Sequence, residues 1–431
     1  MLVNFSVGNF LSFKGVQTLS LVPESLKEHL ANLHVAYFYN PNEKLLKSVA
    51  LHGHNAYGKT NFLKAFKFFQ SFIFNSFTNG QSKTSIDVEP FRLNTIMNDK
   101  PCYFEVTFLV KETKYRYKIL VNSKQVISEE LWYAQAKIRE NLLFDRKLQL
   151  IKVSKQWNKE AENKVEQFVP FAKPHILFLS VLLSQDDISR ITSIGQWIYS
   201  NLIIPDDYLS EFAKARLIYS DPQYRSIILK FIERADLGFT TIFDKIETKS
   251  KSHSKLEKGL LNIIFEKEIK EFELYTGHPV FDGNYNIVGN VEFNLQKNES
   301  AGSIKYFIVV CFLSLAIKNS QLIWIDELDA RLHSDLLEML IGSFHDPDIN
   351  PINSQLIFTT HNTILLDNRL RRDQMVIVEK NQSGESILKR AHSAENPVKI
   401  GKSLEREYRK GKLGGVSKKI RKDLGPTLFD D

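Results

Sequence analysis

Cysteine is scarce in this chain of 431 residues, which contains only Cys102 and Cys311. Two cysteines so far apart exclude both a disulfide framework and a zinc site of the C-x-x-C type. Each lies beside apolar residues, which predicts buried thiols. With 43% hydrophobic residues, a chain of this length can instead form a substantial core and two or three domains.

Long hydrophobic runs are missing as well. No uninterrupted apolar run reaches the roughly 18 residues of a membrane-spanning helix. The opening residues Met1–Phe5 lack the charged and then apolar arrangement of a signal peptide. Repeats and sustained heptads are also absent, which argues against an extended coiled coil. These absences predict a cytoplasmic protein that makes no membrane contact.

The net charge is +7, and its distribution is uneven. From Lys399 to the C-terminus there are ten Lys or Arg and five Asp or Glu, so this tail carries +5 of the total. Such a tail suits contact with a nucleic acid, docking on an acidic partner protein, or plain solvation at a chain end. The sequence leaves these interpretations open.

The most specific motif is residues 53–60, Gly-His-Asn-Ala-Tyr-Gly-Lys-Thr, which fits the phosphate-loop pattern G-x-x-x-x-G-K-[ST]. It follows an apolar run and precedes a helical pattern. Gly53 and Gly58 permit the tight path that points backbone N–H groups at phosphate oxygens, and the helix adds its positive dipole end. Lys59 is expected to reach the β- and γ-phosphates, and Thr60 to offer its hydroxyl to magnesium. The predicted nucleotide-binding residues are Gly53, Asn55, Gly58, Lys59, Thr60 and Asn61.

A second motif is residues 321–329, Gln-Leu-Ile-Trp-Ile-Asp-Glu-Leu-Asp. Four apolar residues that end in two acids predict a buried strand delivering carboxylates to the ligand-binding edge of a sheet. Apolar runs that end in Asp are common, so the motif gains its meaning from the phosphate loop. In a phosphate-loop ATPase Asp326 would hold magnesium, and Glu327 would accept a proton from the attacking water.

Two weaker signals accompany these motifs. A second apolar strand, residues 355–360, ends on His361, which is either a structural hydrogen-bonding group or a contact for the terminal phosphate. Small residues around Ser300 and Gly302 precede an apolar helix, and they suit either an ordinary helix N-cap or an anion cradle.

The remaining pattern predicts an α/β fold. Alternating apolar residues in 103–110 and 114–121 predict an antiparallel hairpin, with 127–133 as a third strand. Phenylalanines spaced by three and four after the phosphate loop predict an amphipathic helix that ends near Asn79. From about residue 150 to 275 the periodicity becomes helical.

Taken together, these motifs resemble the ABC-type ATPase heads of the SMC/RecF superfamily, and more closely its OLD-like abortive-infection ATPases. Residues 9–13, Asn-Phe-Leu-Ser-Phe, are similar to the family's N-F-x-S-F start. The resemblance covers roughly residues 1–135 and 290–400. It makes Ser300 and Gly302 part of the signature motif, Asp326 and Glu327 the Walker B pair, Asp329 part of the D-loop, and His361 the switch histidine.

The resemblance implies a fold and a set of ligands. The fold is an ABC-ATPase head with a parallel sheet core, an antiparallel lobe and a compact helical insert, and the ligands are ATP and Mg²⁺. Glu327 and His361 would be catalytic, and Gln185 is the only candidate for the Q-loop residue that contacts the metal. The implied units are 1–150 and 286–398 as the two halves of the head, 151–285 as the helical insert, and 399–431 as the basic tail.

The resemblance also implies partners. Two heads would meet in a homodimer or higher oligomer, so that Ser300, Gly302 and Asp329 of one subunit complete the site of the other. Too little chain follows His361 for an appended nuclease domain, so a separate effector, a nuclease or toxin, is expected. The implied function is control of that effector in anti-phage defence. The competing function is a DNA-repair or DNA-structural ATPase that binds DNA through its tail.

Overall fold

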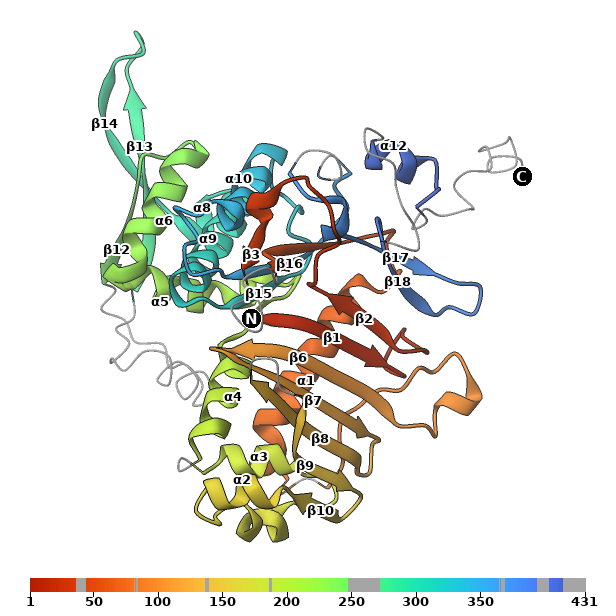
Figure 1. Cartoon of the computed structure of the whole chain (residues 1–431). Helices are drawn as coiled ribbons and strands as arrows, with labels where there is room; N and C mark the ends of the chain where they lie inside the picture. The colour runs from red at the N-terminus through yellow and green to blue at the C-terminus, as the bar shows by residue number, and fades with distance from the viewer. Residues whose placement is uncertain are drawn as a thin grey trace, which may run out of the picture.

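In the computed structural model, a broad antiparallel sheet lies below a second body of strands and helices (Figure 1). The described residues are 1–35, 44–80, 82, 84–135, 139–185, 188–246, 272–363, 365, 369–393 and 403–413.

The six-stranded sheet carries the predicted nucleotide loop. Its order is β11-β15-β16-β5-β17-β18, and the first five strands are parallel. Every residue of β15, β16 and β5 is buried, as expected for parallel strands that are covered on both faces. The strands are β5 Ser48–His52, β11 Leu202–Ile204, β15 Leu322–Ile325, β16 Gln355–Thr360, β17 Met375–Lys380 and β18 Ser386–Arg390.

The seven-stranded sheet is antiparallel, in the order β10-β9-β8-β7-β6-β1-β2. It confirms the predicted hairpin as β6 and β7, and the predicted third strand as β8. The strands are β1 Leu2–Gly8, β2 Gln17–Ser20, β6 Cys102–Val110, β7 Thr113–Val121, β8 Val126–Gln135, β9 Asn141–Lys147 and β10 Leu150–Val153. The mixed α/β class predicted from the sequence is therefore correct.

Helix α1 (Lys59–Asn79) joins the two sheets. On one side the ring of Phe66 lies 5.1 Å from that of Phe5 in β1, and on the other it stacks on Trp324 of β15 at 4.7 Å. The spacing of three and four seen in the sequence thus places aromatic rings against both sheets. Because α1 begins at Lys59, this packing fixes the nucleotide loop relative to β15.

The described helices of residues 151–285, the range expected to form a compact helical insert, divide between two cores. The first helices belong to the core around α1, and the later helices pack on the long helix α9 in a second core. Between them the chain adds β11 to the parallel sheet. The helical periodicity was correct, but amphipathic faces do not specify which core they join. The helices are α2 Lys155–Glu160, α3 Phe178–Leu183, α4 Ser189–Ser200, α5 Phe212–Ser220, α6 Pro222–Ala235, α9 Ala301–Asn319 and α10 Ser334–His345.

A buried charge cluster anchors α3 to the antiparallel sheet. Glu129 of β8 accepts hydrogen bonds from the backbone N–H groups of Phe178 and Leu179, both at 2.8 Å. Tyr117 donates to the same carboxylate at 2.8 Å, and Arg146 lies 3.5 Å from it. The carboxylate therefore fills the role of a helix N-cap from a neighbouring strand. Burial nevertheless raises the pKa of Glu129.

Helix α9 is long and apolar enough to cross a membrane by length and composition alone. Lys305 near its start interrupts the apolar sequence, so no uninterrupted apolar run of spanning length marks this helix. In the structure 83% of its most apolar window is buried inside the protein, where the helix contacts α5 and α6. It is the central helix of the second core.

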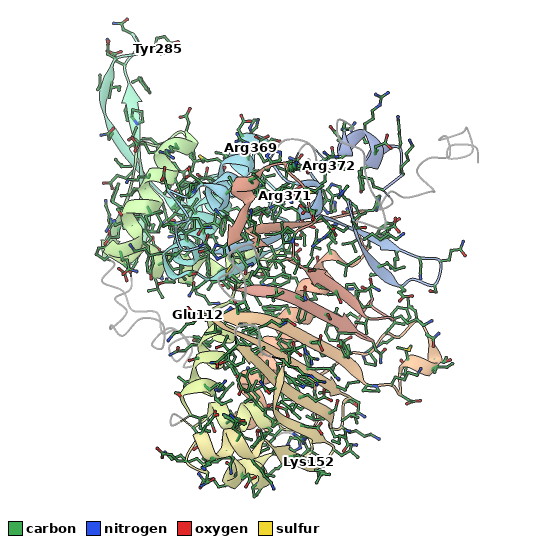
Figure 2. The ribbon with its side chains drawn as sticks, viewed as in Figure 1. Glu112, Lys152, Tyr285, Arg369, Arg371 and Arg372 are labelled. Carbon is green, nitrogen blue, oxygen red and sulfur yellow. The ribbon has the colours of Figure 1, made fainter. Side chains whose placement is uncertain are left out.

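A hairpin of β13 (Phe272–Phe281) and β14 (Ile287–Asn294) extends from the second core, and Tyr285 marks its tip (Figure 2). Apolar side chains are exposed there, including Phe281 at 53%, Tyr285 at 87% and Ile287 at 67%. At its base the strand β12 (Thr241–Ile246) completes a three-stranded sheet.

The shorter elements connect these parts. They are η1 Leu30–Asn32, β3 Leu33–Val35, β4 Lys44–Leu46, η2 Thr95–Met97, η3 Glu166–Phe171, η4 Tyr208–Glu211, α8 Leu295–Asn298, η5 Arg372–Gln374 and α12 Leu404–Arg409.

Candidate nucleotide-binding site

The predicted phosphate loop connects β5 to α1, as its strand-loop-helix context required. Gly58 is the N-cap of α1 and has φ 108°, a conformation that favours glycine. A Cβ at Gly58 would lie only 2.7 Å from the Ser12 hydroxyl, and one at Gly53 would overlap the Val378 carbonyl. Both glycines are therefore required by the close packing of the loop against neighbouring strands.

Lys59 is buried, and its ammonium lies inside the loop. Its Nζ donates to the carbonyls of Gly53 at 2.7 Å and His54 at 3.3 Å. Burial lowers the pKa of Lys59 to about 8, although the nearby carboxylates of Glu327 and Asp326 oppose this shift. At neutral pH the side chain is mostly charged and already points along the loop that would cradle phosphate oxygens.

A pocket of about 290 Å³ brings the predicted residues together. It is lined by Asn55, Ala56, Tyr57, Gly58, Lys59, Thr60, Asn61, Glu327 and His361. The loop, the end of β15 and the end of β16 all contribute, because β16 lies between β5 and β15 in the sheet. Of the predicted nucleotide-binding loop residues, Gly53 is the one that does not line this pocket. Its backbone carbonyl accepts the hydrogen bond from Lys59.

Asp326 fits a magnesium site. It is 1% exposed, and its Oδ1 accepts a hydrogen bond from Thr359 at 2.6 Å. Its Oδ2 is buried and has no hydrogen-bond partner among the described residues. Such an oxygen is costly to leave unpaired, and a cation would satisfy it. No group of three or more His, Cys, Asp or Glu side chains that could hold a metal occurs in the described chain. Mg²⁺ typically takes one or two protein ligands and completes its shell with phosphate and water.

Glu327 and His361 face one another across the pocket. The distance from His361 Nε2 to Glu327 Oε1 is 3.8 Å, and both side chains are about one-third exposed. Burial, Asp206 and Asp326 raise the pKa of Glu327, while Lys59 opposes them. Burial and Lys59 lower the pKa of His361, which favours the neutral imidazole. A carboxylate with a raised pKa next to a neutral histidine suits proton transfer from water.

Asp329 acts within its own chain in this structure. Its Oδ2 accepts a hydrogen bond from the backbone N–H of His361 at 3.0 Å, and its Oδ1 is buried without a hydrogen-bond partner among the described residues. The contact of Asp329 with another subunit's nucleotide stays a prediction.

Ser300 and Gly302 lie at the start of α9 and do not line the pocket that holds Lys59. Ser300 is the N-cap, and its Oγ accepts from the N–H of Ser303 at 3.1 Å. A Cβ at Gly302 would lie 2.7 Å from the carbonyl of Arg331, so the start of α9 packs closely against the segment that follows Asp329. The N-cap interpretation is thus confirmed, and the anion cradle stays a prediction.

Gln185 lies far from the loop, so its prediction as a metal contact is not supported. It shares a pocket with Phe74, Phe77 and Tyr199, near the end of α1 that is opposite to Lys59. The rise of an α-helix puts Phe77 about 27 Å from Lys59. The physical reason is that residues 178–183 form helix α3 rather than a strand ending at the nucleotide edge.

The strand that reaches this edge beside β15 is β11, and the sequence reading missed Asp206 behind it. Ile204 pairs with Ile325, so the chain continues to Asp206 on one strand and to Glu327 on the other. Asp206 raises the pKa of Glu327. The signal was present in residues 202–206, Leu-Ile-Ile-Pro-Asp, an apolar run that ends in an acid.

The described part of the basic tail packs against the head. The ring of Tyr408 in α12 meets that of His52, the residue before Gly53, at 4.5 Å. Glu405 accepts a hydrogen bond from Thr363, two residues beyond His361, at 3.0 Å. This part of the tail is therefore built into the nucleotide-binding edge. The basic residues Lys418, Lys419, Arg421 and Lys422 lie outside the described residues.

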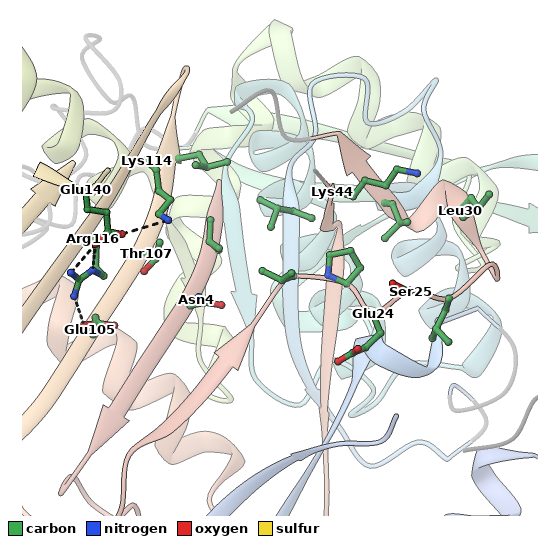
Figure 3. A pocket seen from close by; sticks show the side chains of 17 residues that line it. Asn4, Glu24, Ser25, Leu30, Lys44, Glu105, Thr107, Lys114, Arg116 and Glu140 are labelled. Carbon is green, nitrogen blue, oxygen red and sulfur yellow. Dashed lines mark hydrogen bonds and ion pairs between the residues drawn. The ribbon is translucent and has the colours of Figure 1, made fainter. Parts of the chain in front are cut away.

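A larger cleft of about 780 Å³ lies between the antiparallel sheet and residues 22–33 (Figure 3). The charged side chains that the antiparallel sheet contributes to this cleft are paired with one another. Arg116 contacts Glu140 at 2.8 Å and Glu105 at 3.4 Å, and Lys114 lies 3.5 Å from Glu140. Its lining includes no residue of the phosphate loop.

Comparison with known proteins found one family model and several solved structures that are similar to this chain. Residues 48–367, well over half of the chain, match the family model "AAA domain, putative AbiEii toxin, Type IV TA system". No curated protein gives a significant match. Among solved structures, "Structure of the recombination mediator protein RecF-ATPrS in RecFOR pathway" aligns with 12% identity and a TM-score of 0.34, over 90% of this chain and 98% of that one. "Structure of the recombination mediator protein RecF-ATP in RecFOR pathway" aligns with 10% identity and a TM-score of 0.32, over 90% and 97%. The family match spans the loop of residues 53–60, the acids Asp326 and Glu327, and His361, and the chain belongs to this AAA-domain family.

Proposed function

We propose that this chain is an ATP-hydrolysing subunit of the OLD-like branch, which dimerises on ATP and controls a separate effector in anti-phage defence. The observation that carries the ATPase assignment is the single pocket that unites Lys59 with Glu327 and His361. The family description supports the wider role, because it names a toxin–antitoxin system.

In the proposed mechanism different residues of the site bind the phosphates, hold the metal ion and accept the proton. The loop N–H groups and Lys59 bind the β- and γ-phosphates of ATP. Thr60 and Asp326 would hold Mg²⁺, which would neutralise charge that develops on the phosphate oxygens. Glu327 accepts the proton of the attacking water, and neutral His361 contacts the terminal phosphate or that water.

Dimerisation completes the proposed site. Ser300 lies outside its own pocket, which leaves it available for the γ-phosphate held by a second subunit. We expect mixtures of Lys59→Ala and Ser300→Arg chains to recover ATPase activity, because each heterodimer contains one site with neither change. Activity per heterodimer should approach half of that of the wild-type dimer. Demonstrated heterodimers without recovery would contradict the composite site.

Exposed apolar residues support a protein partner. The tip of the β13–β14 hairpin presents Phe281, Tyr285 and Ile287 to solvent, and residues 279–291 contain no Lys or Arg. An apolar tip without positive charge suits a protein surface better than a polyanion. The hairpin is also tied to the signature loop, since Glu299 accepts a hydrogen bond from Thr276 at 2.5 Å and lies 2.7 Å from His278.

The defence role can be tested in cells. Cells that carry this gene with its native neighbours should resist phage infection, and Lys59→Ala should restore plaque formation. The competing DNA-binding ATPase predicts instead that Lys59→Ala sensitises cells to DNA damage while plaque numbers stay unchanged. It also predicts binding of the purified chain to DNA with a steep salt dependence.

Two truncations separate the roles of the tail. A chain ending after Leu413 should keep its melting temperature and ATP affinity, because α12 still packs on His52, but it should lose effector association. A chain ending after Asn396 should also melt several degrees lower, since it lacks the buried side chains of Leu404, Tyr408 and Leu413, which pack in the second core. Calorimetry and ATP titration measure both effects. Equal melting temperatures of the two truncated chains would contradict this role of α12.

A further inference from the structure

A buried lysine links the signature helix to the loop that carries Glu327. Lys305 lies in the second turn of α9 and is only 2% exposed. Its Nζ donates to the backbone carbonyl of Glu327 at 2.5 Å. Among the described residues no carboxylate lies within ion-pair distance of it, so the carbonyl is its principal polar contact. Burial of an ammonium on a backbone carbonyl is unfavourable unless the geometry is tightly held.

The side chain of Tyr208 also lies next to the ammonium group of Lys305. The Lys305 ammonium lies 5.5 Å from the centre of the Tyr208 ring, within range of a cation–π interaction. The Tyr208 hydroxyl donates to the carbonyl of Ala301 at 3.3 Å and accepts from Arg331 at 2.9 Å. One buried side chain therefore contacts the signature loop, the D-loop and Lys305.

The backbone of Glu327 needs such support. Glu327 has φ 46°, a left-handed conformation that a side chain with a Cβ adopts only when its surroundings impose it. Its N–H donates to Thr359 at 2.6 Å, and its carbonyl accepts from Ala330 at 3.0 Å as well as from Lys305. The bond to Lys305 is the one among these that reaches the signature helix.

We propose that Lys305 and Tyr208 are positioning residues that hold the Glu327 carboxylate in its hydrolytic geometry and tie it to the signature loop of the same chain. The inference rests on the proposed ATPase function. A shift of the start of α9 would move the Glu327 peptide through Lys305, and Tyr208 would move with Ala301. Tyr208 also holds the segment that carries Asp206, two residues earlier.

The test compares Lys305→Met, which keeps the length of the side chain and removes its charge, with Lys318→Met on the same helix. Lys318 is exposed and serves as the matched control. Lys305→Met should lower the single-turnover rate of ATP hydrolysis by about tenfold or more, with the ATP dissociation constant changed by less than about threefold. Lys305→Arg should recover part of the rate. Tyr208→Phe, which keeps the ring and the fold, should lower the rate by a smaller factor of about three to ten.

A double mutant separates positioning from general destabilisation. In a Glu327→Gln background, Lys305→Met should have little further effect on the single-turnover rate, because the group that it positions is gone. If Lys305 had only a general structural role, Lys305→Met would lower ATP affinity, and its effect on the hydrolysis rate would add fully to the effect of Glu327→Gln. That outcome, or normal rates in both Lys305→Met and Tyr208→Phe, would overturn the inference while leaving the ATPase intact. A wild-type chain that binds ATP but never hydrolyses it would overturn the proposed function and this inference together.

Discussion

Lys59→Ala is expected to weaken ATP binding by on the order of a hundredfold or more, because it removes the one buried cation that the loop aims at the phosphates. The ammonium is held by the carbonyls of Gly53 and His54, so the wild-type chain needs little rearrangement to bind. Isothermal titration with ATP and Mg²⁺ measures the loss. Lys64→Ala on the exposed face of the same helix is the matched control, and equal losses in the two variants would contradict the assignment.

The same lysine predicts a pH dependence. The pKa of Lys59 is lowered to about 8, and the protonated form is the one that attracts phosphate. ATP affinity should therefore be constant below about pH 7 and fall as the pH rises through 8, by up to tenfold for each pH unit. The dependence should disappear in Lys59→Ala. An affinity that stays constant from pH 7 to pH 9 in the wild-type chain would show that the loop binds phosphate without this charge.

Glu327→Gln is expected to slow ATP hydrolysis by on the order of a hundredfold or more while ATP remains bound. Glutamine keeps the size of the side chain but cannot accept the proton of the attacking water. Binding should persist, because Lys59 and the loop are untouched. Phosphate release and nucleotide retention on the same samples check both halves of the expectation. Asp335→Asn, an exposed carboxylate in the first turn of α10, is the control. Unchanged turnover in Glu327→Gln would assign the base elsewhere, with Asp206 as the next candidate.

The spacing of residues in the sequence predicted those elements that form from neighbouring residues. The loop of residues 53–60, helix α1 and the β6–β7 hairpin were all visible in residue spacing, because each element is stabilised by residues close in sequence. The parallel sheet was inferred from single strands that end in functional groups. Its order, with β16 between β5 and β15, came only from the structure.

The elements that the sequence did not predict correctly depend on contacts between residues far apart in the chain. Strand β11 is three residues long, too short for periodicity to mark, and it exists as a strand because β15 pairs with it. For the same reason Gln185 was chosen in place of Asp206. The helices of residues 151–285 were visible, but their division between two cores follows from which neighbours, α1 or α9, each apolar face meets.

The sequence predicted the side chains expected to face the nucleotide more fully than it predicted the side chains that hold them in place. Motif spacing identified the groups that would meet nucleotide. Lys305 and Tyr208 belong to no such motif, since a lysine in an apolar helix and a tyrosine after a proline have many ordinary roles. Their significance arises from a buried bond to one carbonyl and from a left-handed residue in the acidic loop.

The sheet order has a consequence for how the chain is made. Within the described part of the chain, strand β5 pairs with β16 and β17, which begin at Gln355 and Met375. On the ribosome the antiparallel strands β6 to β10 can pair soon after they emerge, whereas the apolar strand β5 must wait for most of the remaining chain to be synthesised. During that time the nascent chain has a phosphate loop but no sheet to hold it. Folding of the nucleotide site should therefore be slow, dependent on chaperones and sensitive to premature termination, and it should coincide with completion of the last quarter of the chain.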